Sequence, residues 1–181
     1  MHRRFISVAA SAMLAIMLAA CATAPDTRAG KERLENAAQD VLSFAEFKEP
    51  GIDAILRNAR GYAVFPRVGK GGLIAGGTYG RGVLYELGAI VGYCDVTQVT
   101  FGGQIGGQAY TMIICFETKD AIDRLKSGTL AFDAVTSAVA NRSGATAAAK
   151  YANGVMVFVM DESGLMAQAT IGAQKFRYQP K

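Results

Sequence analysis

Tryptophan is absent from the sequence, and histidine occurs once, as His2 near the N-terminus. Loss of an N-terminal segment containing His2 would leave a chain without histidine, which excludes a Ser-His-Asp triad, a Cys-His pair and a histidine-ligated zinc. Charged residues make up only 19% of the 181 residues, and the net charge of +4 is too small to mark a nucleic-acid-binding protein. We therefore expect no metal, no nucleic-acid partner and no histidine-based catalysis.

Apolar residues are abundant, at 51% of the chain. A chain of this length and hydrophobicity buries enough surface to fold without a disulfide or a metal. We therefore expect a folded domain rather than a disordered chain.

The first 20 residues have the pattern of a bacterial lipoprotein signal peptide. Arg3 and Arg4 form a basic start, and no charge occurs from Phe5 to Leu18. This apolar run is too short to cross a bilayer comfortably. It ends in Leu18-Ala19-Ala20-Cys21, which resembles the lipobox, where cleavage leaves Cys21 as an acylated N-terminus. The alternative is ordinary secretion, with the cysteine there by chance.

The residue after Cys21 indicates a location. It is Ala22, whereas an Asp there would be a signal for retention in the inner membrane, so the sequence favours the outer membrane. We expect residues 1–20 to be the signal peptide, 21–29 a lipidated tether and 30–181 a single domain. The lipid would anchor the protein in the bacterial envelope, facing the periplasm or the cell surface.

Two further cysteines remain after removal of the signal peptide, Cys94 and Cys115. An oxidising periplasm permits a disulfide between them. They are equally consistent with buried free thiols, because cysteine is among the most frequently buried residue types. No C-x-x-C motif accompanies them, so a redox role is not indicated.

Helical patterns occur near the start and in the middle of the chain. Apolar residues at helical spacing predict an amphipathic helix from Gly30 to Phe47, which ends before Pro50-Gly51. A second, short helix is expected to end near Gly61. A third is predicted over 119–126, with Thr118 as its N-cap.

Strand patterns fill most of the remaining chain. Of the 21 glycines, 14 lie between Gly61 and Gly107, and β-rich runs separate them. These runs are Tyr62–Phe65, Leu73–Ala75, Val83–Leu87, Val96–Phe101 and Ala109–Phe116. Further strands are predicted at 154–160, 165–171 and 174–178, with a hairpin turn at 161–164.

The segment 130–140 is ambiguous, since its alanines favour a helix and its alternating Thr, Val and Phe favour a strand. The pattern as a whole predicts an α+β fold. We expect a mainly antiparallel β-sheet or a partly closed barrel, with N-terminal helices and one helix in the middle of the chain.

The glycine-rich region lacks the residues that phosphate-binding loops require. In Arg67-Val68-Gly69-Lys70-Gly71, Gly71 stands where a P-loop needs Ser or Thr, and Val64 replaces the first glycine. A G-x-G-x-x-G motif would need a glycine at Ile74. We therefore expect no nucleotide and no other cofactor.

The carboxylates do not form a convincing catalytic pair. Asp120 and Asp123 lie near the start of a predicted helix, where a negative charge interacts favourably with the positive end of the helix dipole. Asp95 is isolated in an apolar run, where it either caps a turn before a strand or acts as a carboxylate of raised pKa; we favour the cap. The protein is expected not to be an enzyme.

Charge is distributed unevenly along the chain. Residues 26–53 contain seven acids and four bases, whereas 54–85 contain five bases and no acid. The basic, glycine-rich segment could hold an anionic head group with Arg67, Lys70 and Arg81, helped by backbone amides. The alternative is a set of scattered, solvated charges. The C-terminal cations at 175, 177 and 181 lie outside this segment and are expected to matter less.

Several motifs in the chain resemble those of SYLF domains. They are Gly61-Tyr62-Ala63-Val64-Phe65-Pro66, Gly69-Lys70-Gly71-Gly72, Gly80-Arg81-Gly82-Val83-Leu84, Asp95-Val96-Thr97-Gln98-Val99, the run 102–108 and Gly164-Leu165-Met166-Ala167. The resemblance extends from about Leu34 to Tyr178.

The resemblance implies lipid binding rather than a reaction. Eukaryotic members of the family bind phosphoinositides through an amphipathic N-terminal helix and basic residues, and fungal members also bind actin. Here the corresponding helix is net acidic and actin is an implausible partner in the envelope. Two functions follow: a lipoprotein that binds an anionic lipid or amphiphile, or a structural lipoprotein whose basic segment contacts an envelope protein or polysaccharide.

Overall fold

A computed structural model describes residues 25, 27–72, 75–101, 108–130, 146, 149–161, 164–168 and 174–181. Cys21 and the predicted signal peptide lie outside these residues, as does 131–140 of the ambiguous segment. Within the described part, no helix is both long and apolar enough to span a membrane.

Three helices match the sequence predictions closely: α2 (Arg28–Lys48), α3 (Gly51–Asn58) and α4 (Lys119–Lys126). The Thr27 hydroxyl caps α2 by accepting from the backbone N–H of Gly30, at 3.1 Å. Thr118 caps α4 in the same way through Ala121. Because α2 begins at Arg28, the last two residues of the predicted tether are helical.

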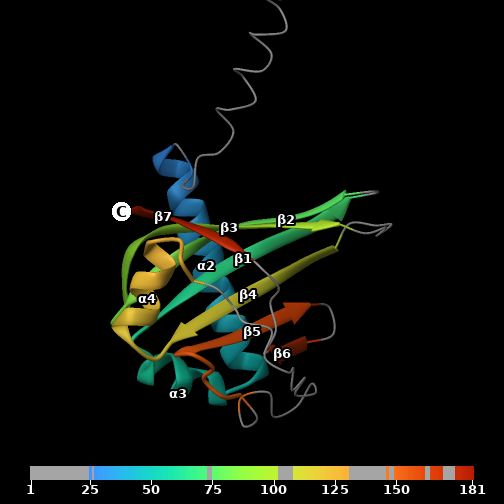
Figure 1. The fold of residues 1–181 in the computed structure, drawn as a ribbon. Coiled ribbons are helices and arrows are strands. Elements are labelled where there is room, and N and C mark those ends of the chain that lie inside the picture. Colours follow the sequence, from blue (N-terminus) through green and yellow to red (C-terminus); the bar gives the residue numbers. More distant parts are fainter. Residues whose placement is uncertain are drawn as a thin grey trace, which may run out of the picture.

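Seven strands form a single antiparallel sheet in the order β6-β5-β4-β1-β2-β3-β7 (Figure 1). They are β1 (Gly61–Gly72), β2 (Ala75–Glu86), β3 (Ala89–Phe101), β4 (Gln108–Phe116), β5 (Val155–Asp161), β6 (Gly164–Gln168) and β7 (Lys175–Pro180). The predicted α+β class with a mainly antiparallel sheet is confirmed. The sheet is open, with β6 and β7 at its edges.

The strands are longer than the sequence patterns indicated. The predicted run at Val96–Phe101 is only the second half of β3. Its first half contains Gly92, where a Cβ would collide with the Tyr178 ring of the neighbouring strand, so this glycine permits close packing and does not interrupt the strand. Of the predicted strand at Leu73–Ala75, residues 73 and 74 lie outside the described residues, and Ala75 is the first residue of β2.

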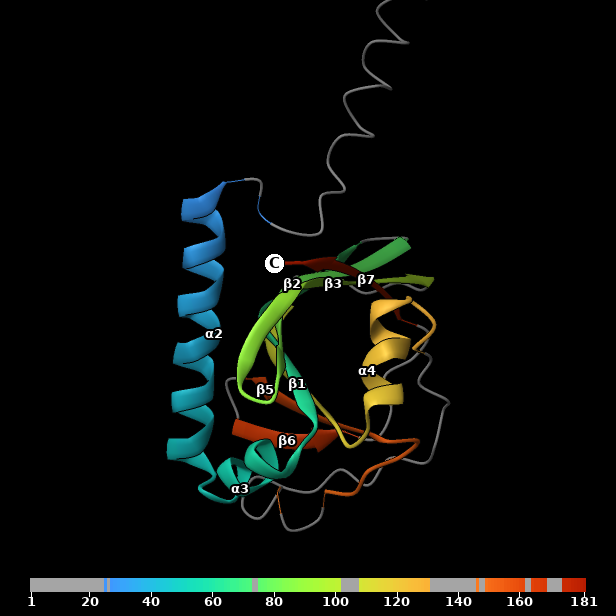
Figure 2. The ribbon, with the colours of Figure 1, turned by 90° about the vertical axis from the view of Figure 1, so that its left-hand side faces the viewer.

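The two faces of the sheet carry separate hydrophobic clusters. On one face, α2 and α3 bury Ala38, Leu42, Ala45, Ile52 and Leu56 against residues including Val64, Val83, Tyr93 and Ile113. On the other face, α4 buries Ala121, Ile122 and Leu125 against residues including Phe65, Leu84, Cys94 and Phe116. Figure 2 shows the sheet curving around α4, with α2 standing along the opposite face.

The disulfide alternative for Cys94 and Cys115 is wrong, because both are free and buried. They pack in the clusters on opposite faces of the sheet. Two strands, β1 and β2, separate β3 from β4, which places the cysteines roughly 14 Å apart at the usual strand spacing. A disulfide requires Cα atoms within about 7 Å. Burial raises the pKa of the Cys115 thiol to about 12.

A β-bulge interrupts β1 at Phe65 and Pro66. Val64 lies opposite Val83 of β2, and the next aligned pair is Arg67 with Arg81, so β1 contains one more residue than β2 between the two pairs. The pairing of β1 with β4 shifts at the same place. The extra residue returns Arg67 to the face that carries Val64, the α2 face, instead of the α4 face.

Glycines opposite the bulge allow the two backbones to approach. A Cβ on Gly82 would lie 2.7 Å from the Val64 carbonyl oxygen and 2.8 Å from the Phe65 ring. A Cβ on Gly80 would lie 2.8 Å from the Val68 side chain. These contacts explain why two glycines occupy the interior of a long strand.

A polar contact fixes α2 over the sheet. The Tyr93 hydroxyl donates to Glu35 Oε1 of α2 at 2.6 Å, and Lys181 Nζ lies 3.7 Å from the same oxygen. The Lys31 ammonium lies 5.0 Å from the centroid of the Tyr93 ring. These residues join the N-terminal half of α2 to β3 and to the C-terminal residue of the chain.

Replacing Gly82 with Ala is expected to destabilise the protein by about 1–3 kcal/mol, because the new methyl group meets a backbone oxygen and a fully buried ring. Gly77→Ala is the matched control, since its Cβ would be 3.8 Å from its nearest neighbour, the Gln98 carbonyl oxygen. Urea unfolding curves measure the free energy of unfolding of both variants. Equal free energies of unfolding for the two variants would show that the strands do not approach closely at the bulge.

Stability is expected to fall at alkaline pH. Burial raises the pKa of Tyr85 and of Tyr93 to about 12, and for Tyr93 the hydrogen bond to Glu35 adds to the effect. In the unfolded chain these phenols ionise near pH 10. Their contribution to the free energy of unfolding is therefore complete below pH 10 and is lost between about pH 10 and 12. Unfolding free energies measured from pH 8 to 11 should show this decline, and Tyr93→Phe should make it shallower. A decline equally steep in Tyr93→Phe would contradict the assignment.

Candidate functional site

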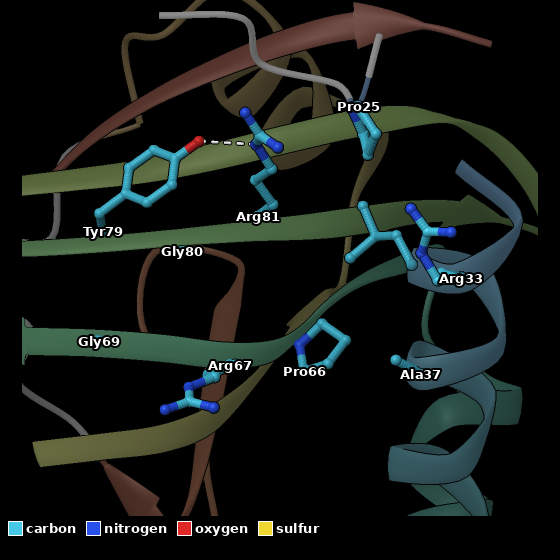
Figure 3. Close-up of a pocket in the computed structure, with 10 residues that line it drawn as sticks. Pro25, Arg33, Ala37, Pro66, Arg67, Gly69, Tyr79, Gly80 and Arg81 are labelled. Carbon is cyan, nitrogen blue, oxygen red and sulfur yellow. Dashed lines mark hydrogen bonds between the residues drawn. The ribbon is translucent and has the colours of Figure 1, made fainter. Parts of the chain in front are cut away.

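A pocket of about 520 Å³ lies between the N-terminal half of α2 and the strands β1 and β2. Strand residues form one side of it and helix residues form the other (Figure 3). Its lining residues are Pro25, Arg33, Leu34, Ala37, Pro66, Arg67, Gly69, Tyr79, Gly80 and Arg81. Three of the ten are arginines and none is acidic.

Two of the three cations predicted from the sequence meet at this pocket. Arg67 of β1 and Arg81 of β2 are direct cross-strand neighbours, so their side chains leave the same face of the sheet. The bulge at Pro66 produces this alignment, because without the extra residue Arg67 would belong to the α4 face. The pocket therefore depends on a local irregularity in β1.

Lys70, the third predicted cation, belongs to β1, and its side chain lies outside the described part of the structure. The backbone register pairs it with Thr78 of β2 and Gln108 of β4. Of the cations predicted from segment 54–85, the described residues that line the pocket include Arg67 and Arg81.

Tyr79 orients Arg81 at the pocket. The Arg81 Nε donates to the Tyr79 hydroxyl at 2.8 Å, and the guanidinium carbon lies 5.9 Å from the ring centroid. Tyr79 remains 46% exposed, which is unusual for a large aromatic ring in the middle of a sheet. This contact fixes the direction of the Arg81 guanidinium at the edge of the pocket.

The third arginine of the pocket is Arg33, which the sequence analysis did not single out. It comes from α2, whose net acidic charge gave no reason to expect a cation of the anion site there. Arg33 directly precedes Leu34 and lies four residues before Ala37, so all three share one side of the helix. A signal was present in the sequence, since Arg33 borders the apolar stripe that was expected to face the core.

The three guanidinium groups border the pocket from different directions. Figure 3 shows Arg81 directed toward Tyr79, Arg33 projecting from α2, and Arg67 on the β4 side of β1. Leu34, Ala37, Pro25 and Pro66 supply apolar surface between them. The arrangement provides both cationic groups and a hydrophobic wall.

The predicted tether reaches the pocket through Pro25. Pro25 packs against the start of α2, where a Cβ on Gly30 would lie 2.7 Å from the Cβ of the proline. Cys21 precedes Pro25 by four residues, so an acyl group on Cys21 would be attached within roughly 14 Å of chain from this point. The lipid attachment predicted from the sequence therefore lies close to the pocket in the chain.

No carboxylate is among the described residues that line the pocket. Glu86 of β2 forms an ion pair with Lys126 of α4. Asp95 is buried at 2% exposure within β3, opposite Arg81, rather than capping a turn before a strand as expected. Among the residues described, no three His, Cys, Asp or Glu side chains are grouped to hold a metal ion.

Comparison with known proteins identifies one family. Residues 97–179 match the family described as Ysc84, Las17-binding protein actin regulator. This region runs from the second half of β3 to β7 and is somewhat less than half of the chain. No curated protein shows significant similarity to the chain.

The matched region contains part of the motif set that resembles SYLF domains, including the glycine-rich run at 102–108 and the motif at 164–167. The earlier motifs, at 61–66 and 80–84, lie on β1 and β2 of the same sheet. Over residues 97–179, the chain is therefore similar to the Ysc84 (SYLF) family, a domain family of the lipid-binding type.

Proposed function

We propose that the protein is a non-catalytic lipoprotein of the bacterial envelope that binds the anionic head group of a lipid or amphiphile in the pocket between α2 and β1–β2. The observation that carries this proposal is the lining of the pocket, where Arg33, Arg67 and Arg81 lie beside apolar residues and none of the ten described lining residues is acidic. A charged end and an apolar end of one ligand would both find matching surface there.

Arginine suits this role better than a general positive charge does. Its planar guanidinium group donates two parallel hydrogen bonds to a phosphate or carboxylate. Leu34 and Ala37 from α2, with Pro66 from the bulge, offer contact to the first carbons of an acyl chain. The volume of about 520 Å³ is in the range of ligand pockets, which are commonly about 300–1,000 Å³.

Membrane attachment would bring the ligand to the pocket. An acylated Cys21 inserted in the outer membrane would hold Pro25, and with it the pocket, near the lipid head groups. At such short range the local concentration of anionic lipid is high, so a modest intrinsic affinity is sufficient. A lipid is therefore a better candidate for the ligand than actin, which would be absent from the envelope.

The second candidate is a structural lipoprotein whose basic segment contacts an envelope protein or polysaccharide. It uses the same arginines but assigns no role to the apolar wall of the pocket. The two functions therefore differ in one measurable respect, since only the first requires an acyl chain on the ligand.

The three pocket arginines are expected to be required for binding. In the mature chain carrying Cys21→Ser, which cannot be acylated, the combined change of Arg33, Arg67 and Arg81 to Gln should weaken binding to phosphatidylglycerol vesicles at least tenfold, because each charge-assisted hydrogen bond contributes about 1.5–3 kcal/mol. Vesicle flotation measures the binding. The control changes Arg57, Lys119 and Lys150 to Gln, with the same loss of charge at exposed positions.

Equal losses in the two triple variants would show that net charge alone drives the binding. Dodecyl phosphate and inorganic phosphate separate the two candidate functions: calorimetry should detect only the amphiphile. Equal affinity for both would favour the protein or polysaccharide contact.

Lipidation is expected to depend on Cys21, whose thiol would be the acceptor of the acyl chain. Cells labelled with a fatty acid should incorporate label into the wild-type protein and not into the Cys21→Ser variant, which should remain unprocessed or soluble. Cys94→Ser is a suitable control, since that thiol is buried. Equal labelling of wild type and Cys21→Ser would exclude the anchor.

A further inference from the structure

A row of charged residues crosses four strands next to the pocket. The register aligns Arg67 of β1 with Arg81 of β2, Arg81 with Asp95 of β3, and Asp95 with Arg177 of β7. Directly opposite residues in antiparallel strands project from the same face, so all four belong to the α2 face. The row begins at the pocket and continues to the edge of the sheet.

The cations of β7 are exposed on the same face. Lys175 and Arg177 are both exposed, whereas Phe176 between them is buried in the cluster on the α4 face. Lys175 is aligned with Thr97, which in turn is aligned with Tyr79. Each β7 cation therefore lies two strands away from a residue that lines the pocket, Arg81 or Tyr79.

The sequence alone does not indicate this placement. Lys175 and Arg177 are almost 100 residues beyond Arg81 in the chain, outside the basic segment 54–85. Because β7 pairs with β3, it returns to within two strand spacings of Arg81, or roughly 10 Å. The basic surface is assembled from two distant parts of the sequence.

Asp95 divides this surface into two cationic groups. It is 2% exposed and is the one acidic residue among the buried polar and charged side chains that are described. One group is Arg33, Arg67 and Arg81 at the pocket, and the other is Lys175 and Arg177 on β7. Five cations therefore accompany one buried carboxylate. The nearby Glu35 is engaged with Tyr93 and Lys181.

From this arrangement we infer a second anion subsite at Lys175 and Arg177, so that the preferred ligand carries two anionic groups about 10 Å apart or closer. The inference rests on the proposed function and names the ligand class more narrowly. A long arginine or lysine side chain spans several ångströms, so the two groups of cations can reach two phosphates of one head group across Asp95. A ligand with a single anionic group would occupy the pocket alone.

Vesicle flotation with two compositions tests the inference. The mature chain carrying Cys21→Ser is mixed with phosphatidylcholine vesicles that contain phosphatidylglycerol, with one phosphate per lipid, or cardiolipin, with two. Cardiolipin is present at half the mole fraction, so that the total charge is equal. The wild-type sequence should bind the cardiolipin vesicles at least fivefold more tightly.

Replacing Lys175 and Arg177 together by Gln should abolish this preference while leaving most of the binding to phosphatidylglycerol. The control Arg57→Gln with Lys150→Gln removes the same charge from exposed positions and should retain the preference. Circular dichroism verifies that β7 remains folded, and the conservative pair Lys175→Arg with Arg177→Lys should restore the preference.

The outcomes separate the two proposals. Equal binding of both vesicles by the wild type, or an unchanged preference in the Lys175 and Arg177 variant, overturns the second subsite and leaves the pocket in place. Failure of the wild type to bind either vesicle overturns the pocket and the second subsite together. Loss of both kinds of binding in a variant that remains folded would mean that β7 contributes general charge, and this result also overturns the second subsite.

Discussion

The pocket depends on one packing constraint, the bulge at Phe65–Pro66 held against Gly80 and Gly82. In a regular strand, Arg67 would belong to the α4 face of the sheet. One extra residue moves it to the α2 face and into register with Arg81. The bulge persists because the opposite strand has no side chain where the two backbones approach. The glycines thus serve the site indirectly, by fixing the direction of a charged residue on the neighbouring strand.

The helix α2 completes the pocket and depends on a second set of contacts. Its apolar stripe packs against the sheet, and the bond between Glu35 and Tyr93 fixes its N-terminal half where Arg33 and Leu34 face the strands. The helix is net acidic, yet it presents a cation to the pocket. Placement therefore matters more than total charge, and the same is true of Lys175 and Arg177, which reach this surface only because β7 pairs with β3.

Much of the fold could be predicted from the sequence, because helical periodicity, N-caps and β-rich runs are local signals. The helix boundaries at Thr118 and near Lys48 came from such signals, and so did the basic segment with Arg67 and Arg81. Register and topology could not be predicted in this way. They decide that Arg177 is close to Arg81 and that Cys94 and Cys115 lie on opposite faces.

Photo-crosslinking tests most directly whether lipid is bound at the pocket. A photoreactive p-benzoylphenylalanine is placed at Tyr79, which lines the pocket and is 46% exposed, or at Phe47, a more accessible aromatic position at the other end of α2 that is 80% exposed. After irradiation with phosphatidylglycerol vesicles, mass spectrometry identifies any adduct. We predict a lipid adduct at position 79 and little at 47. An adduct at 47 with none at 79 would contradict the account and place the lipid contact at the end of the helix.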